Sequence, residues 1–255
     1  MLQVIPYPEI NAFLTNFSEG VQAIFRGQLV GVYLFGSLSY GDFVLERSDI
    51  DLVVITKSMT NEEQYLEIEA LSKQMDAKFP SWVARWECSY VPLNWLDSNA
   101  PPIEPRPYYG EGTLCRAEYG NEWIINKYLL YQHGLSVVGP NFNTLIKEIP
   151  IEAVQKACIR DLEKEWAPKL NDDAWLSNQH YQSYLVLNLC RILHTVLNGK
   201  VSSKKVSGDW VKEQFPQWQE LIDAASTWHY GQDMNKTTQT KEFLQFAIDR
   251  VSQIR

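Results

Sequence analysis

Residues 29–56 read LVGVYLFGSLSYGDFVLERSDIDLVVIT, and this stretch decides the fold of the first part of the chain. The apolar run at 29–35 predicts a buried β-strand, which stops at Gly36-Ser37. The apolar run at 50–56 predicts a second buried strand, and the polar, glycine-containing stretch between the two runs predicts a loop. We therefore expect two strands of one sheet, connected by a loop that leaves the sheet at Gly36.

The ends of these two predicted strands carry residues that suit phosphate and metal binding. Asp49 and Asp51 are two positions apart, so on a strand both side chains leave the same face. Two adjacent carboxylates repel each other unless a cation lies between them, and Mg²⁺ prefers such oxygen ligands together with phosphate. Gly36 lets a ligand approach the backbone, where N–H groups and the Ser37 hydroxyl can bind phosphate oxygens. Either motif alone is weak evidence, but their order along the chain predicts a metal–nucleotide site.

The rest of the chain divides into a mixed part and a helical part. Apolar spacing and β-forming residues predict, in the first part, helices over 8–27, 61–79 and 122–133, a strand over 82–91, and a Pro- and Gly-rich loop over 99–112. No strand is predicted after about Pro150, where the spacing predicts helices over 151–170, 181–197, 204–215, 217–228 and 240–254. We expect two domains, 1–150 and 151–255.

Two blocks of sequence resemble a known family. The order of strand, Gly-Ser, spacer and Asp-x-Asp resembles the nucleotidyltransferase signature of the DNA polymerase β superfamily. The blocks LCRIL (189–193), LNGKVSSK (197–204) and GDWV (208–211) resemble the helical domain of the aminoglycoside 3''- and 9-adenylyltransferases, which confer streptomycin and spectinomycin resistance. The resemblance covers nearly the whole chain. It implies an α+β fold, in which a polymerase β-like nucleotidyltransferase domain with a mixed sheet precedes an all-helical C-terminal domain.

The resemblance also implies roles for the residues of the first domain. Ser37 and Ser48 match residues that contact the ATP triphosphate, and Asp49 and Asp51 match the Mg²⁺ ligands. Glu87, in the strand predicted over 82–91, matches the general base. An alternative from the residues themselves is that Glu87 is only a surface partner of Arg85.

Three further residues match nucleotide contacts of the family. Glu122 falls where the family has an acidic residue near the nucleotide, Lys204 matches a phosphate-contacting Lys, and Tyr230 matches a nucleotide-contacting Tyr. Each also has an ordinary structural interpretation. Lys204 can be a solvated charge that follows a helix-capping Ser203, and Tyr230 can be a core residue.

The acceptor-binding residues are less well defined by the sequence. Family members that act on streptomycin recognise it with a Trp and an acidic residue ahead of the 189–193 block. Extra residues here shift the alignment, and the possible counterparts are Trp166, Trp175, Asp172 and Asp173. Beside them, Glu87 is expected to contact the acceptor.

Composition limits the function classes. A net charge of −8 and a pI of about 5.1 argue against broad electrostatic binding of nucleic acid and suit a small cationic acceptor. The four Cys have no CxxC spacing and no HExxH occurs, so a zinc site is not expected, and the unpaired pattern fits a reducing cytoplasm. Neither a signal peptide nor a membrane span is expected. We expect a cytoplasmic monomer.

The function implied by the resemblance is Mg²⁺-dependent transfer of AMP from ATP to a hydroxyl of an aminoglycoside or aminocyclitol antibiotic, with release of pyrophosphate. The acceptor is expected between the two halves. Two alternatives stay open. One is a nucleotidyltransferase that acts on another small molecule or on a protein. The other is a nucleotidyltransferase-like antitoxin or regulatory protein, against which the long fused helical half argues.

Overall fold

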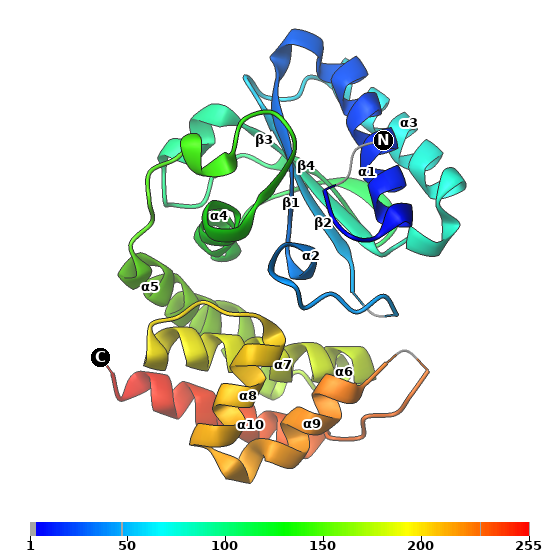
Figure 1. Cartoon of the computed structure of the whole chain (residues 1–255). Helices are drawn as coiled ribbons and strands as arrows, with labels where there is room; N and C mark the ends of the chain where they lie inside the picture. Colours follow the sequence, from blue (N-terminus) through cyan, green and yellow to red (C-terminus); the bar gives the residue numbers. More distant parts are fainter. Residues whose placement is uncertain (1–3, 47, 230, 255) are drawn as a thin grey trace. The chain divides into compact units, whose positions relative to one another are not determined.

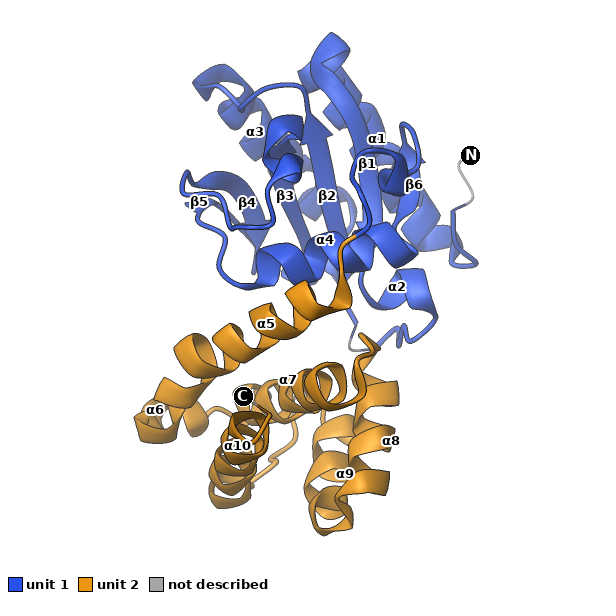
Figure 2. Ribbon diagram, turned by 90° about the vertical axis from the view of Figure 1, so that its left-hand side faces the viewer, with its two compact units in different colours: residues 1–148 blue, residues 149–255 orange. Residues whose placement is uncertain are grey.

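The computed structural model describes residues 4–46, 48–229 and 231–254. The chain folds as two compact units, residues 1–148 and 149–255, which Figure 2 shows in different colours. The division lies close to Pro150, where the sequence predicts a domain boundary. None of the described helices is long and apolar enough to cross a membrane.

Unit 1 is built around a mixed six-stranded sheet with the order β5-β4-β3-β2-β1-β6. Strands β2 and β3 run parallel, and the other neighbouring pairs are antiparallel. The strands are β1 (Leu29–Phe35), β2 (Ile50–Thr56), β3 (Trp86–Pro92), β4 (Arg106–Gly110), β5 (Thr113–Ala117) and β6 (Leu135–Val138). The helices are α1 (Pro8–Phe25), α2 (Ser37–Tyr40), α3 (Glu62–Lys78) and α4 (Glu122–His133).

Alternation of side chains along the strands gives the sheet two differently covered faces. On one face, residues such as Leu34, Val54 and Trp86 pack in a large apolar cluster with α1 and α3. On the other, residues such as Val53 pack in a smaller cluster with Trp123 of α4. Figure 1 shows α1 and α3 on one side of the sheet and α4 on the other. These are called the α1/α3 face and the α4 face below.

Several sequence predictions for unit 1 are confirmed. The strands predicted over 29–35 and 50–56 and the helix predicted over 122–133 have those bounds in the structure. Helix α3 begins where a capping box is formed, because the Asn61 side chain accepts from the Gln64 backbone (2.9 Å) and the Gln64 side chain accepts from the Asn61 backbone (3.1 Å).

Three expectations for unit 1 are wrong. The third strand begins at Trp86 rather than at residue 82, because Pro80–Trp82 form a 3₁₀ turn and Ala84 has a positive φ of 58°. The stretch predicted as a loop contains β4, because its prolines lie mostly before Arg106–Gly110 and leave a Tyr-Tyr pair to form the strand. Strand β2 begins at Ile50, so Asp49 lies one residue ahead of it rather than within it.

Unit 2 is helical, and no strand occurs among its described residues. Its helices are α5 (Ile151–Asp161), α6 (Asp173–Leu176), α7 (Gln179–Asn198), α8 (Lys204–Gln214), α9 (Gln219–Thr227) and α10 (Thr237–Ser252). The helix predicted over 151–170 is interrupted: α5 is followed by a π-helical turn and then by a 3₁₀ segment that contains Pro168, which cannot continue an α-helix.

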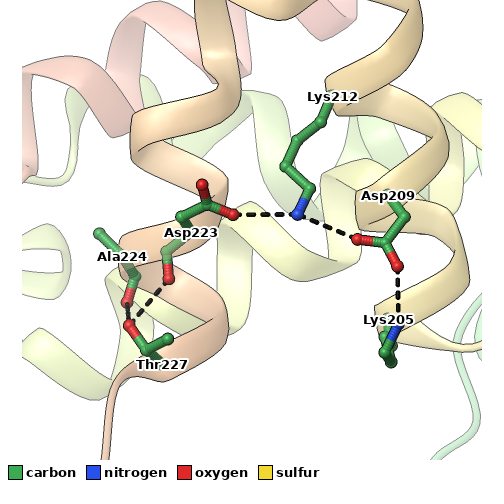
Figure 3. Close-up of polar contacts among 6 residues, drawn as sticks. All are labelled: Lys205, Asp209, Lys212, Asp223, Ala224 and Thr227. Carbon is green, nitrogen blue, oxygen red and sulfur yellow. Dashed lines mark hydrogen bonds and ion pairs between the residues drawn. The ribbon is translucent and has the colours of Figure 1, made fainter.

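Helix α7 is the centre of unit 2 and packs against α5, α8, α9 and α10. It ends at Gly199, which adopts the left-handed conformation, and Ser203 caps α8 by accepting from the Val206 backbone (3.1 Å). Helices α8 and α9 are joined by Lys212, which pairs with Asp209 and Asp223 (2.9 Å each; Figure 3).

Candidate active site

The centre of the candidate site is the contact between Gly36 and Asp51. Gly36 follows β1 with a φ of 67°, a conformation that side-chain-bearing residues rarely adopt. A Cβ atom at this position would overlap the Oδ2 atom of Asp51. Because Phe35 and Asp51 are paired across β1 and β2, the register itself brings the carboxylate to the turn. The structure therefore brings the Gly-Ser part and the Asp-x-Asp part of the sequence motif into contact.

The Gly-Ser turn continues into the short helix α2. Ser39 donates from its backbone N–H (3.0 Å) and from its hydroxyl (2.8 Å) to the Gly36 carbonyl, and Asp42 N–H donates to the Ser37 carbonyl (3.1 Å). The first N–H groups of any helical turn lack partners within it. A half-buried Ser37 at the start of α2 thus lies where backbone N–H groups and a hydroxyl are available to an anion.

The loop that leads to β2 is fixed by hydrogen bonds around Ser48. The Ser48 hydroxyl accepts from the Val44 backbone (2.9 Å), and Arg85 donates to the carbonyls of Leu45 (2.6 Å) and Ser48 (2.7 Å). Arg85 therefore anchors this loop. Asp49, which follows, is exposed, whereas Asp51 is half-buried.

Glu87 lies beside Asp51. Strands β2 and β3 are parallel, and their register pairs Asp51 with Glu87. Neighbouring strands lie about 4.8 Å apart, so the two backbones are adjacent and both side chains leave the α4 face. Among the described residues, no three His, Cys, Asp or Glu side chains form a metal-binding group by themselves. Any ion held here by these carboxylates would need oxygen ligands from elsewhere, such as phosphate.

The other predicted nucleotide contacts are found in different places. Glu122 lies in the first turn of α4, and its carboxylate accepts from the Gly120 backbone (2.9 Å). Lys204 is the first residue of α8 in unit 2, with its Nζ atom 4.9 Å from the centre of the Tyr184 ring. Tyr230 lies outside the described residues.

The predicted acceptor-binding acids of unit 2 have lysine partners. Asp172 pairs with Lys169 (3.1 Å) and accepts from the Trp175 backbone (3.0 Å), and these two bonds, the backbone bond first, hold the pKa of Asp172 below its ordinary value. Asp173 pairs with Lys241. The Trp175 ring stacks on Tyr181 with centroids 4.7 Å apart and planes at 9°.

Two polar residues of the α4 face, Arg106 and Tyr108, were not predicted from the sequence as site residues. Arg106 is only 6% exposed and donates to the Ser89 hydroxyl (3.0 Å), and its guanidinium lies 3.4 Å from the centre of the Tyr119 ring. Tyr108 is paired with Ser89 in the sheet. These residues were missed because their segment was interpreted as a loop. The available signal was the β-forming Tyr-Tyr pair.

A Gly-Ser turn packed against an aspartate of a central strand, with a second carboxylate on the parallel neighbour, defines a nucleotidyltransferase. Comparison with known proteins agrees. A nucleotidyltransferase domain model matches residues 14–95, and the model of the C-terminal domain of aminoglycoside adenylyltransferases matches residues 144–253. The chain is an aminoglycoside adenylyltransferase-like nucleotidyltransferase.

Individual relatives are 20–25% identical to this chain and differ in how much of it they cover. A spectinomycin 9-adenylyltransferase from Staphylococcus aureus is 24% identical over 234 residues, covering 83% of this chain and 82% of the relative. An aminoglycoside (3'') (9) adenylyltransferase from Klebsiella pneumoniae is 25% identical over 127 residues, covering 48% and 46%. The crystal structure of the Enterococcus faecalis spectinomycin adenyltransferase with ATP and spectinomycin has the same fold, with a TM-score of 0.75, 20% identity, and coverage of 94% of this chain and 98% of that one.

Proposed function

We propose that this enzyme transfers AMP from MgATP to a hydroxyl of an aminocyclitol antibiotic and releases pyrophosphate, with spectinomycin as the first acceptor to test. The observation that carries the proposal is the Asp51 carboxylate held against Gly36. Spectinomycin is favoured because relatives named for spectinomycin match more than four-fifths of the chain, whereas the (3'') (9) enzymes match about half.

The carboxylates suit Mg²⁺. Asp49 and Asp51 offer hard oxygen ligands two positions apart in the chain, and Mg²⁺ is commonly held by one or two carboxylates with phosphates and water completing its shell. Held by these carboxylates, Mg²⁺ would supply positive charge that offsets the charge on the phosphates during transfer. Asp51 is half-buried and its backbone position is set by the sheet register, so it would be the fixed ligand, and the exposed Asp49 would be the adjustable one.

The Gly36-Ser37 turn would bind the triphosphate of ATP. Gly36 has no side chain to block the approach, and the N–H groups that begin α2 act with the Ser37 hydroxyl as donors. Ser48 would approach the same phosphates from the loop that Arg85 holds in place. Glu122, at the start of α4, would contact the nucleotide.

Glu87 would act as the general base. Its carboxylate lies beside Asp51 and would accept the proton of the acceptor hydroxyl as the oxygen attacks the α-phosphorus and the bond to pyrophosphate breaks. Positioned bases of this kind contribute about 10²–10⁴-fold to the rate. The same negative charge favours a cationic acceptor.

Unit 2 would supply further contacts. Lys204 and Tyr230 are proposed to contact the nucleotide, and Trp175 with Asp172 and Asp173 to contact the acceptor. The two acids would have to exchange their lysine partners for cationic groups of the acceptor, and solvent screening keeps such solvent-accessible ion pairs weak. The enzyme is proposed to act as a cytoplasmic monomer, without a nucleic-acid or membrane partner.

The test is a pyrophosphate-release assay with each of the four NTPs and with spectinomycin, streptomycin, a lincosamide and an acceptor-free control. We expect ATP-dependent release with spectinomycin, and a product heavier than spectinomycin by one AMP group. Pyrophosphate release with the lincosamide and with no other acceptor would show that a lincosamide, not spectinomycin, is the substrate. The absence of transfer to every acceptor would favour the regulatory alternative.

The base is tested by Glu87→Gln. If Glu87 is the base, the variant binds MgATP normally and acceptor with only a small change in affinity in calorimetry, while single-turnover transfer falls by about 10²–10⁴-fold. If Glu87 is instead a metal ligand, MgATP binding weakens in proportion to the lost rate. An unchanged rate would remove Glu87 from the mechanism.

A further inference from the structure

Two adjacent tyrosines of β4 contact carboxylates on opposite faces of the sheet. Tyr109 points to the α1/α3 face, where it donates to Asp76 (2.6 Å) and stacks on Trp86 with centroids 3.9 Å apart. Tyr108 points to the α4 face, opposite Ser89 of β3. Strand β4 therefore places one tyrosine, Tyr109, in the core and the preceding one, Tyr108, at the candidate site.

The position of the Tyr108 hydroxyl is defined by Gly110. A Cβ atom on Gly110 would lie 2.5 Å from that hydroxyl oxygen and 2.7 Å from the ring Cζ, so the Tyr108 ring extends along its own strand over Gly110. The register pairs Ser89 with Tyr108 and Cys88 with Tyr109, and one further step places Gly110 opposite Glu87. The hydroxyl thus lies at the side of Glu87.

The electrostatics agree with this geometry. Burial, followed by the negative charge of Glu87 and a hydrogen bond to it, raises the pKa of Tyr108 far above its ordinary value, and the charge of Asp51 adds to the shift. Tyr108 therefore remains a neutral hydrogen-bond donor throughout the range in which the enzyme would work.

The Tyr108 ring is also held from its other side. The Arg106 guanidinium lies 5.1 Å from the centre of the ring, and it is fixed by Ser89 and by the carbonyls of Ala117 and Glu118 (2.8 Å each). A tyrosine held between a buried guanidinium and a glycine loses little conformational freedom when it binds a carboxylate.

We infer that Tyr108 is a positioning residue for the transfer reaction, whose hydroxyl donates to the Glu87 carboxylate and orients it toward the acceptor hydroxyl. This inference rests on the proposed function, in which Glu87 is the base. One carboxylate oxygen is occupied by Tyr108, which leaves the other oxygen to accept the proton. Tyr108 acts only through Glu87, so its loss should change the rate of transfer and not the affinity for either substrate.

The test is Tyr108→Phe, with Tyr109→Phe as the matched control. We expect kcat of Tyr108→Phe to fall by roughly tenfold to a hundredfold, the size expected for losing a hydrogen bond to a charged group, with KM for ATP and acceptor within about twofold of wild type. Tyr109→Phe removes the equivalent bond to Asp76 and should lower the melting temperature while leaving kcat unchanged. Equal kcat values for the two variants, or a raised KM with normal kcat, would overturn the inference.

A double-mutant cycle separates this inference from the proposed function. In the Glu87→Gln background, Tyr108→Phe should cause little further loss of rate, because the residue that it orients no longer accepts a proton. Additive losses would overturn the positioning role while leaving Glu87 as the base. A Glu87→Gln variant as fast as wild type would instead reject the proposed base. Gly110→Ala provides a second check, because it keeps the hydroxyl but displaces it and should lower kcat as Tyr108→Phe does.

Discussion

The two faces of the sheet in unit 1 are covered by helices of the same chain but bury different chemistry. The α1/α3 face holds the larger apolar cluster, in which Phe13 and Phe17 lie edge-on to Trp86 (centroids 5.5 and 5.6 Å apart). The α4 face has the smaller apolar cluster. It also buries a guanidinium and an ammonium group, since Arg106 is 6% exposed and Lys127 is 2% exposed.

This difference assigns stability mainly to the α1/α3 face of the sheet and chemistry mainly to the α4 face. Apolar burial stabilises a domain without directional demands, whereas buried charges lower stability unless each is hydrogen-bonded. Both cations of the α4 face meet that condition through backbone carbonyls. We therefore expect substitutions on the α1/α3 face to change mainly the free energy of unfolding, and substitutions beside Asp51 to change mainly the rate of transfer.

The largest expected effect tests the difference between the two faces with one substitution on each face. Asp51→Asn should lower kcat/KM by roughly 10³-fold or more, because a bound metal ion supplies several kcal/mol of transition-state stabilisation. Asp76→Asn keeps one acceptor oxygen for Trp86 or Tyr109 and loses the other, at a cost of about 1–3 kcal/mol of stability. Its kcat should match wild type. Transfer assays and urea unfolding on both variants check the pair, and near wild-type turnover by Asp51→Asn would refute the metal assignment.

A second pair of variants examines the Gly36 contact. Gly36 and Gly41 both have positive φ, 67° and 85°, but Gly36 has a ψ of −155°, so alanine is strained by about 1–3 kcal/mol at Gly36 and by about 1 kcal/mol at Gly41. Only at Gly36 would the new Cβ meet Asp51, since no atom lies within 4 Å of the corresponding position at Gly41. We expect Gly36→Ala to lower transfer by about 10²-fold or more, as expected for a misplaced catalytic group. Gly41→Ala should remain active, and equal activities would show that the contact is unimportant.

The apolar face is examined by Phe17→Ala. Phe17 is fully buried against Trp86, and removing such a ring costs about 3–5 kcal/mol. Urea unfolding should show this loss, whereas kcat of the folded fraction at low temperature should be unchanged. A selective loss of kcat with normal stability would contradict the separation of the two faces.

The sequence predicted what depends on local pattern. The apolar run of β1 ends just before Gly36, and the apolar run of β2 begins at Ile50, next to Asp51. The bounds of the two strands and the motif between them therefore follow from composition and alternation. Alternation also puts Glu87 on one face of its strand. The parallel pairing that brings Glu87 beside Asp51 depends on tertiary contacts, and only the family resemblance assigned it a role in advance.

Non-local contacts explain the rest. Strand β4 is held by pairing with β3 and β5 despite Pro107, so Tyr108 and Arg106 were missed as site residues. The ion pair between Asp173 and Lys241 joins residues far apart in the sequence, and no pattern near either residue predicts it. The structure thus supplies the strand register and the interaction partners, which the residue types alone do not specify.

The smallest expected effect concerns the buried Lys127 of the α4 face. Its ammonium group donates to the carbonyls of Leu96 (2.7 Å) and Ser98 (2.9 Å), and burial lowers its pKa from 10.5 to about 8. Between these two values Lys127 binds more protons in the unfolded chain than in the folded one, so the contribution of this residue to the free energy of unfolding should rise by about 1–2 kcal/mol as pH increases from about 8 to 9.5. Burial raises the pKa of Cys88, Cys158 and Cys190, so these thiols ionise over the same range only in the unfolded chain and lower the free energy of unfolding. The effect of Lys127 is therefore measured as a difference between variants.

Between pH 8 and 9.5, Lys127→Met should lose about 1–2 kcal/mol more of its free energy of unfolding than wild type, and the exposed Lys57→Met is the matched control that should follow wild type. Urea unfolding of the three proteins at pH 7, 8, 9 and 9.5 measures the slope directly. Equal pH slopes for Lys127→Met and wild type would contradict the lowered pKa of Lys127. A difference confined to Lys127→Met would establish that the α4 face buries an ammonium group at a cost in stability.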